Sequence, residues 1–185
     1  MLQTSQPQPD KVSYWDVDAN GTIRHRCNGI LHRSDGPAVI YPNGTLEWWW
    51  YNQPHREDGP AVIHAAGGTD WWLHGMRHRD DGPAVEWADG HEEWWVNGQL
   101  HRTDGPARIS PGSMTLWCQY GQLHRIDGPA VIDKDQFEAW YQFDKRHRVD
   151  GPAVIQANGT TEWWLDGKQY DQLTHWILRN ETANN

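Results

Sequence analysis

The residues best suited to chemistry are a histidine, an arginine and an aspartate that recur within four positions, as in His101, Arg102 and Asp104. A histidine beside a carboxylate could act as a general base, and an arginine could hold an anion. The group is part of a motif, His-Arg-x-Asp-Gly-Pro-Ala, which occurs six times at a constant spacing of 23 residues, beginning at His32, His55, His78, His101, His124 and His147. An active site is needed once, and no nucleophile recurs beside the motif. We therefore predict that the protein is not an enzyme.

A structural role for the motif follows from the same residues. We expect the aspartate to cap the turn before Gly-Pro and the arginine to pair with the aspartate of a neighbouring repeat. Metal binding is disfavoured because zinc ligands lie about 2.0–2.1 Å from the ion. Equivalent histidines on successive two-stranded repeats would be roughly 9–10 Å apart. We expect no metal site and no cofactor.

A fixed period of this length is typical of a linear array of one supersecondary unit. Two columns of turn residues alternate along the chain. The first holds Gly21, Gly44, Gly67, Gly90, Ser113, Gln136 and Gly159, with Asn or Asp before most of them, and the second holds Gly29, Asn52, Gly75, Gly98, Gly121, Asp144 and Gly167. Asn-Gly and Asp-Gly predict two-residue hairpin turns in which both residues have positive φ. The second column predicts a positive φ at every position, because only Gly, Asn and Asp occur there.

Two strands per repeat lie between these turns, as in Pro37–Tyr41 and Leu46–Trp50. Their β-branched and aromatic residues favour a pleated surface. The predicted fold is all-β: an elongated antiparallel meander of about seven 23-residue β-hairpin repeats, forming one continuous sheet in a single domain over residues 11–169. Residues 1–10 are expected to be a disordered polar tail, and residues 170–185 a C-terminal capping helix and tail.

The capping helix is predicted from a short amphipathic pattern. Leu173, Trp176 and Ile177 have i, i+3, i+4 spacing, and Asp171 is suited to the N-cap position. We expect the apolar stripe to cover the end of the sheet.

At this point the chain resembles the MORN-repeat family, in particular a variant of it. The resemblance rests on the segment Trp95-Val96-Asn97-Gly98-Gln99-Leu100-His101, on the Asp-Gly or Asn-Gly turn that follows and on the period, and it covers residues 12–169. The chain departs from the family where Arg-x-Asp-Gly-Pro-Ala replaces the glycine after the histidine. Repeats of this style are similar to those of uncharacterised proteins from phages and large DNA viruses. The resemblance implies a scaffold or binding platform and identifies no ligand.

Two adjacent columns carry most of the 14 tryptophans. The first is unbroken and consists of Trp48, Trp71, Trp94, Trp117, Trp140 and Trp163, whereas the second consists of Trp49, Trp72, Trp95, Cys118, Tyr141 and Trp164. Neighbouring strand residues point to opposite faces. We predict that the unbroken column is structural and stacks on Gly-Pro-Ala segments, and that the second is an exposed aromatic ladder flanked by acids. The alternative is that the sheet curls and buries the second column as well.

Two repeats depart from the pattern in several columns together. Arg108 replaces a valine, Cys118 and Tyr141 replace tryptophan, and Leu116 and Ala139 replace an acid. These changes indicate either sequence drift or a local binding patch near residues 108–143.

Composition excludes several classes of partner. The net charge is -9, with 25 acids against 16 Lys and Arg, which disfavours nucleic acid. The apolar runs are too short for insertion into a membrane, and the N-terminus lacks the features of a signal peptide. Cys27 and Cys118 are four repeats apart, so we expect free thiols and a cytoplasmic location.

We therefore hypothesise a non-enzymatic binding module, of the kind that a virus uses to bind and block a host protein through an aromatic face. The candidate binding residues are Trp49, Trp72, Trp95, Tyr141, Trp164, Glu47, Asp70, Glu93 and Arg108. The acids among them favour a basic protein partner. The alternatives are a sponge for a nucleotide-like small molecule, held by stacking on tryptophan and by arginine, and a structural scaffold or spacer; self-association into a homo-oligomer is a further option.

Overall fold

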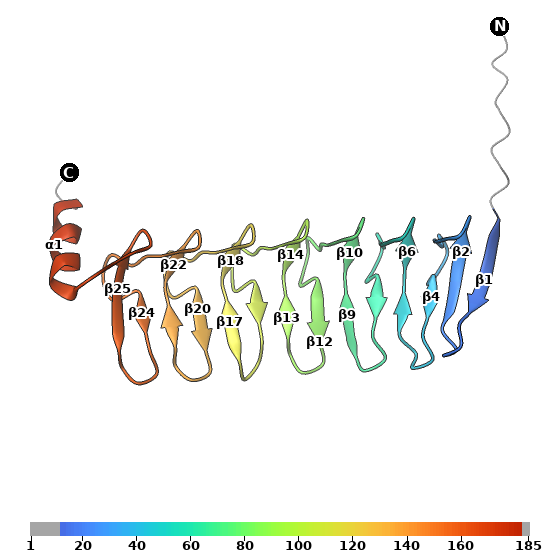
Figure 1. The fold of residues 1–185 in the computed structure, drawn as a ribbon, viewed down its shortest axis with the longest axis horizontal. Coiled ribbons are helices and arrows are strands. Elements are labelled where there is room, and N and C mark those ends of the chain that lie inside the picture. Colours follow the sequence, from blue (N-terminus) through green and yellow to red (C-terminus); the bar gives the residue numbers. More distant parts are fainter. Residues whose placement is uncertain (1–11, 183–185) are drawn as a thin grey trace, which may run out of the picture. The chain divides into compact units, whose positions relative to one another are not determined.

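The computed structural model describes residues 12–182 and confirms an all-β antiparallel meander with one C-terminal helix. The described residues form 26 strands and one helix. The chain divides into two compact units, residues 1–76 and residues 77–185. The expectations for residues 1–10 and for the last three residues lie outside the described part (Figure 1).

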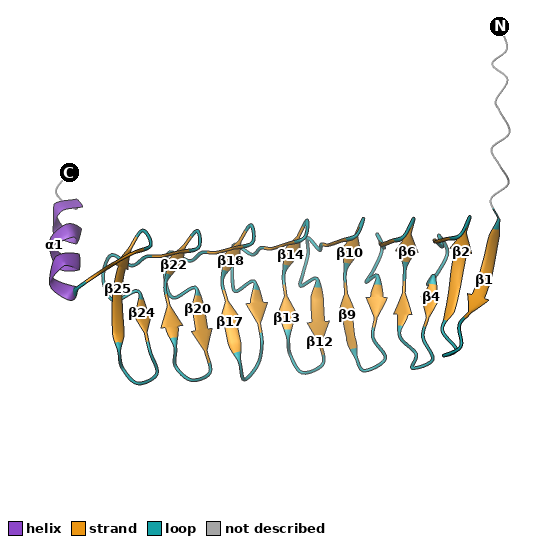
Figure 2. Cartoon of the chain, viewed as in Figure 1, coloured by secondary structure: helices purple, strands orange, loops and turns teal. Residues whose placement is uncertain are grey.

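Each repeat contributes two hairpins rather than the single one expected. β4 (Val39–Ile40) and β5 (Leu46–Glu47) pair within a main sheet, whereas β6 (Trp49–Trp50) and β7 (Gln53–Pro54) form a separate small hairpin. Figure 2 shows such small hairpins at one end of the main-sheet strands. The prediction of one continuous sheet needs this correction, because the expected second strand is divided at its first tryptophan.

Trp48 is the residue at which the chain leaves the main sheet. Its N–H donates to the carbonyl of Ala61 at 2.8 Å, a bond of the main sheet, but its own carbonyl accepts from the N–H of His55 at 3.1 Å. The backbone is therefore shared between two hairpins at this position. The same bonds recur at Trp94, Trp117 and Trp140.

In the first unit the main sheet has the order β1-β2-β4-β5-β8-β9, and β3 pairs with β2. The bounds not yet given are β1 (Ser13–Val17), β2 (Ile23–Cys27), β3 (Ile30–Leu31), β8 (Val62–Ile63) and β9 (Gly68–Asp70). The small hairpin of β10 (Trp72–Leu73) and β11 (Met76–Arg77) contains the boundary between the units.

In the second unit the main sheet runs from β12 to β26 in sequence order, without the small hairpins. Its strands are β12 (Val85–Trp87), β13 (Glu92–Glu93), β16 (Arg108–Ile109), β17 (Met114–Leu116), β20 (Val131–Asp133), β21 (Glu138–Ala139), β24 (Val154–Ile155), β25 (Thr161–Leu165) and β26 (Lys168–Tyr170). The small hairpins pair β14 (Trp95–Val96) with β15 (Gln99–Leu100), β18 (Cys118–Gln119) with β19 (Gln122–Leu123), and β22 (Tyr141–Gln142) with β23 (Lys145–Arg146).

The small hairpins end in the turns that the second column predicts. All seven of its residues have positive φ, between 62° and 84°, and so does each preceding residue, between 47° and 52°. Two successive residues at positive φ are the signature of a two-residue turn with the right twist for a hairpin. In three copies the first of them is an aromatic residue, Tyr51, Tyr120 or Phe143, which is uncommon for a bulky side chain.

The turns of the first column differ from the two-residue prediction. At Asn43-Gly44 only the glycine has positive φ, 91°. The N–H of Tyr41 donates to the carbonyl of Thr45, which closes a three-residue loop. The side-chain oxygen of Asn43 accepts from the N–H of Thr45 at 2.9 Å. Asparagine thus stabilises this turn through its side chain rather than by entering the left-handed region.

The core is thin and consists mainly of small aliphatic residues. The alanine of every motif copy is fully buried: Ala38, Ala61, Ala84, Ala107, Ala130 and Ala153. The next residue is a buried valine in five of the six copies, and Arg108 in the sixth.

The C-terminal helix α1 (Gln172–Thr182) forms as predicted, with Asp171 as its cap. One carboxylate oxygen of Asp171 accepts from the N–H of Thr174 at 2.9 Å and the other from its hydroxyl at 2.7 Å. The prediction for its buried face was wrong. Leu173 and Trp176 are 68% and 58% exposed, whereas His175 is 1% exposed.

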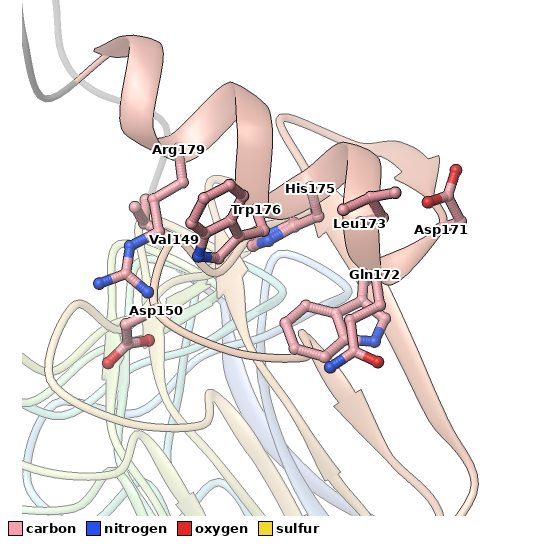
Figure 3. Close-up of a pocket in the computed structure, with 9 residues that line it drawn as sticks. Val149, Asp150, Asp171, Gln172, Leu173, His175, Trp176 and Arg179 are labelled. Carbon is pink, nitrogen blue, oxygen red and sulfur yellow. The ribbon is translucent and has the colours of Figure 1, made fainter.

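A buried polar group explains which side of α1 packs on the sheet. The Nε2 atom of His175 lies 2.7 Å from the carbonyl oxygen of Arg148, and its ring lies 5.0 Å from that of Trp163. The apolar stripe instead borders an open pocket of about 580 Å³ that also includes Val149 and Asp150 (Figure 3).

Candidate functional site

The arginines of four motif copies stack on a tryptophan of the unbroken column, whereas Arg33 of the first copy lies 5.1 Å from the ring centroid of Trp15. The guanidinium carbon of Arg102 lies 4.0 Å from the ring centroid of Trp94. Its Nε donates to Asp104 at 2.8 Å and its NH1 to the carbonyl of Pro106 at 3.4 Å. The same stack is formed by Arg56 on Trp48, Arg125 on Trp117 and Arg148 on Trp140, at 4.0–4.3 Å. These tryptophans therefore have a structural role, as expected. They stack on an arginine, however, and not on the Gly-Pro-Ala segment that the sequence predicted.

The motif aspartate pairs within its own repeat, and not with a neighbour as expected. The Arg-Nε to Asp distance is 2.7–2.9 Å in all six copies. A two-residue separation in a tight loop lets the carboxylate reach the guanidinium directly. This hydrogen bond, together with the arginine charge, lowers the pKa of Asp104. The carboxylates remain 73–84% exposed while the arginines are largely covered, so the loops present negative charge to solvent.

The motif histidine connects successive repeats. In five of the six copies its Nδ1 accepts from the backbone N–H of the first turn residue in the following small hairpin, for example from His74 to His55 at 3.1 Å and from Tyr120 to His101 at 3.1 Å. The exception is His124, whose Nδ1 is buried without this bond. The rings also stack, with centroids 4.3 Å apart in both pairs. A ring that accepts at Nδ1 carries its proton at Nε2 and has no lone pair left to act as a base.

An open groove lies between the first two motif copies in the first unit. It has a volume of about 870 Å³ and is lined by Arg33, Ser34, Asp35, Gly36, Pro37, Trp48, Trp50, His55, Arg56, Glu57, Asp58 and His74. We call it the aromatic groove. The comparable groove between the copies at His101 and His124 has a volume of about 320 Å³.

Trp50 distinguishes the aromatic groove from the other repeats. Its ring centroid lies 4.2 Å from that of His32 and 6.3 Å from that of His55. The equivalent positions carry Leu73, Val96, Gln119, Gln142 and Leu165. The rim carries the carboxylates of Asp35, Glu57 and Asp58, which are 80%, 81% and 84% exposed. Sequence reasoning missed this site, although the run Trp48-Trp49-Trp50 occurs in one repeat alone.

The second tryptophan column is not an exposed ladder. Trp49, Trp72, Trp95, Tyr141 and Trp164 are all half-buried. The indole N–H groups of three of them donate to the acid two residues before, from Trp49 to Glu47, Trp95 to Glu93 and Trp164 to Glu162, at 2.7–2.9 Å. The small hairpin turns each ring back over the acid of the main sheet. The structure therefore agrees better with the alternative interpretation, in which the second tryptophan column is covered, than with an exposed ladder.

The acids of this column do not form a charged surface either. Asp70 is 8% exposed and Glu93 is 3% exposed. Glu93 contacts Arg77, His91 and Arg108 as well as the indole of Trp95. Burial alone would raise the pKa of Glu93, but the Trp95 hydrogen bond and the charge of Arg108 outweigh it and lower the pKa.

The irregular positions of the second unit have interior contacts. Arg108 stands directly opposite Glu93 in the register of β13 and β16, so its charge compensates the buried acid. The Nε of Arg146 donates to the hydroxyl of Tyr141 at 3.3 Å. Cys118 is 3% exposed, and burial raises its pKa to about 11.

Comparison with known protein families and with curated proteins found no match for this chain. Within residues 12–182, no three His, Cys, Asp or Glu side chains gather into a group that could hold a metal ion. No helix in that range is long and apolar enough to cross a membrane. Cys27 and Cys118 are both buried free thiols.

Proposed function

We propose that this protein is a non-enzymatic binding module that takes a basic segment of another protein into the aromatic groove. The observation that carries the proposal is the combination of Trp48, Trp50, His55 and His74 in a groove of about 870 Å³ with three exposed carboxylates at its rim. Tryptophan and arginine are the residue types most enriched at binding hot spots.

Charge supports a basic partner. The chain carries a net charge of -9, and the cations of the groove are already engaged, with Arg33 bound to Asp35 and Arg56 bound to Asp58. A Lys or Arg side chain would find the carboxylate of Glu57, which is 81% exposed and has no arginine among residues 12–182 bound to it, only the ring of His55 at 3.8 Å. It would also find aromatic faces for a cation–π contact. The phosphate of a nucleotide would meet the same carboxylates, so the small-molecule alternative is weaker.

Repetition supports a binding role over catalysis. Six copies of one motif use their polar groups on one another, in the Arg-Asp pair, the Arg-Trp stack and the histidine bond between repeats. The resemblance to MORN repeats is in line with a binding platform, and because similar repeats occur in uncharacterised phage and large-DNA-virus proteins, we propose that the partner is a host protein which this chain blocks. The free thiols are consistent with action in a reducing cytoplasm.

The proposal is tested by selecting peptides of 12 random residues on the immobilised full-length protein. We expect the selected sequences to be enriched in Lys or Arg next to an aromatic residue. We also expect their affinity to fall as salt concentration rises, because exposed charges are screened. Selection of acidic sequences, or of none above background, would contradict the proposal.

Trp50→Leu provides the matched variant, because leucine occupies the same column in two other repeats. This change removes one aromatic ring from the groove and puts in its place a residue that the repeat already accommodates at this position. We expect affinity for the selected peptides to fall at least about tenfold, with an unchanged β-sheet circular-dichroism spectrum.

A further inference from the structure

The N-terminal strand β1 (Ser13–Val17) is an edge of the main sheet in the first unit. It pairs with β2 along its whole length, from Ser13 opposite Cys27 to Val17 opposite Ile23. Among residues 12–182, no strand pairs with its other side. Tyr14, Trp15 and Val17 are 43%, 46% and 65% exposed. A free edge of this length and composition is a template for another strand.

The register identifies the backbone groups that point outward. The N–H of Asp18 donates to Thr22, and the carbonyl of Val12 accepts from Asn28. In an antiparallel pair, residues alternate between those that exchange hydrogen bonds with the partner strand and those that do not. The even-numbered residues of β1 therefore face β2. Ser13, Trp15 and Val17 direct three N–H donors and three carbonyl acceptors away from the sheet.

We propose that β1 pairs with β1 of a second copy of this chain, antiparallel and with Trp15 opposite the partner's Trp15. In that register Ser13 stands opposite the partner's Val17. All three outward residues of each copy then exchange both bonds, so six hydrogen bonds form and no outward group of β1 stays unpaired. A shift by two residues in either direction leaves some of them without a partner.

Side chains and symmetry agree with a second copy as the occupant. A twofold axis at Trp15 gives a closed dimer, because the same surface serves both copies. Tyr14 stands opposite the partner's Asp16, so no like charges meet, and Asp16 is already bonded to Arg24 and Arg26. The two Trp15 rings lie on one face of the joined sheet, each beside its own His25 and Arg33. Pairing brings the two half-exposed rings next to each other, within contact distance.

Disulfide trapping tests the register. In Trp15→Cys the two Cα atoms would lie about 5.5 Å apart across the axis, within the range for a disulfide. In the matched control Ser13→Cys the two Cα atoms would lie about 14 Å apart. The native thiols, Cys27 and Cys118, are buried. Under mild oxidation of the full-length protein we expect Trp15→Cys to crosslink at least about tenfold faster than Ser13→Cys. A mixture of Ser13→Cys protein and Val17→Cys protein should also crosslink, because these two positions stand opposite each other in the proposed register. Equal rates for the two single variants, or no crosslinking by either, would overturn the proposal.

Sedimentation velocity tests the backbone bonds independently. Val17→Pro removes an outward N–H and leaves the bonds to β2 intact, because proline is tolerated on a free edge, and Val17→Ala is its control. We expect the dimer dissociation constant to rise at least about tenfold for proline and less than about threefold for alanine, with similar thermal midpoints of the monomers. A wild-type protein that stays monomeric at about 100 µM, or a dimer that Val17→Pro leaves unchanged, would refute the pairing. If the proline variant does not fold, the crosslinking rates decide.

Discussion

The guanidinium group of Arg102 lies against the Cα of Gly105, where a Cβ atom would come within 2.8 Å of the guanidinium carbon. The same approach, 2.7–2.9 Å, occurs in all six copies of the motif. The φ of this glycine is not in the positive range. Glycine is therefore required here by space, because the arginine is fixed between Trp94, Asp104 and the carbonyl of Pro106.

This relationship predicts a coupling between the two positions. Gly105→Ala should lower the free energy of unfolding by about 1–3 kcal/mol, because the methyl group displaces the arginine from its partners. In an Arg102→Ala background the same change should cost less than about 0.5 kcal/mol. Urea denaturation of the four proteins measures the coupling. Equal costs in both backgrounds would show that the glycine is needed for another reason.

Glu93 offers a second test, because it is buried and bound by several donors. Glu93→Gln should lower stability by about 2–3 kcal/mol, since it leaves Arg108 without its charge partner. This cost lies at or below the lower end of the range of about 3–5 kcal/mol for breaking a buried ion pair, because the Arg108 side chain is 40% exposed. The control is Glu86→Gln, where the acid is 46% exposed and bound to Arg79, and a cost below about 1 kcal/mol is expected. Thermal or urea melts that rank the two variants in the opposite order would contradict the assignment.

The repeat architecture was predictable because each column has a local physical cause. The left-handed turn at Gly98, for instance, follows from a column that admits only Gly, Asn and Asp. The second hairpin of each repeat was not predictable in this way, because the run Leu46–Trp50 has one continuous strand pattern. The strand is divided at Trp48 because its N–H donates to the carbonyl of Ala61, in the next repeat, and its carbonyl accepts from the N–H of His55, across the turn of the small hairpin.

The candidate site was harder to predict than the fold. The prediction that Trp49 and Glu47 face solvent assumed that nothing covers the face of the sheet on which they lie. The small hairpins instead bring each indole onto its acid. The aromatic groove depends on Trp50, whose departure from its column was visible in the sequence. The rings come together because His55 lies near Trp50 and stacks on His74, and these contacts were not visible in the sequence.

The contact between His55 and His74 predicts a pH dependence of stability. Burial, and next the nearby charge of His74, lower the pKa of His55 below 6.5, although Glu57 opposes the shift. The unfolded chain therefore takes up a proton at a higher pH than the folded chain. Stability should fall as the pH drops from 6.5 through the folded pKa, and should not fall further from this group below it. Urea midpoints at a series of pH values between 7.5 and 5 measure this loss, and His55→Gln should reduce it. A wild-type midpoint that rises toward pH 5.5 would contradict the sign.

The packing of α1 predicts opposite outcomes at adjacent residues. His175→Ala should lower stability by about 1–3 kcal/mol, because it leaves the carbonyl of Arg148 buried without a donor. Trp176→Ala should cost less than about 0.5 kcal/mol, since this ring is 58% exposed. Thermal melts of both variants test which face of α1 packs on the sheet. If the apolar stripe were the buried face, Trp176→Ala would cost more stability than His175→Ala.

A pair of charge reversals tests whether a basic segment binds in the aromatic groove. Glu57→Lys changes a rim carboxylate that is 81% exposed, and Asp135→Lys makes the same change of net charge at an acid that is 71% exposed and does not line the groove. Isothermal titration with one selected basic peptide gives the dissociation constant for each. We expect at least about tenfold weaker binding for Glu57→Lys and less than about a twofold change for Asp135→Lys. Equal weakening by both variants would show that only net charge matters and would contradict the groove as the binding site.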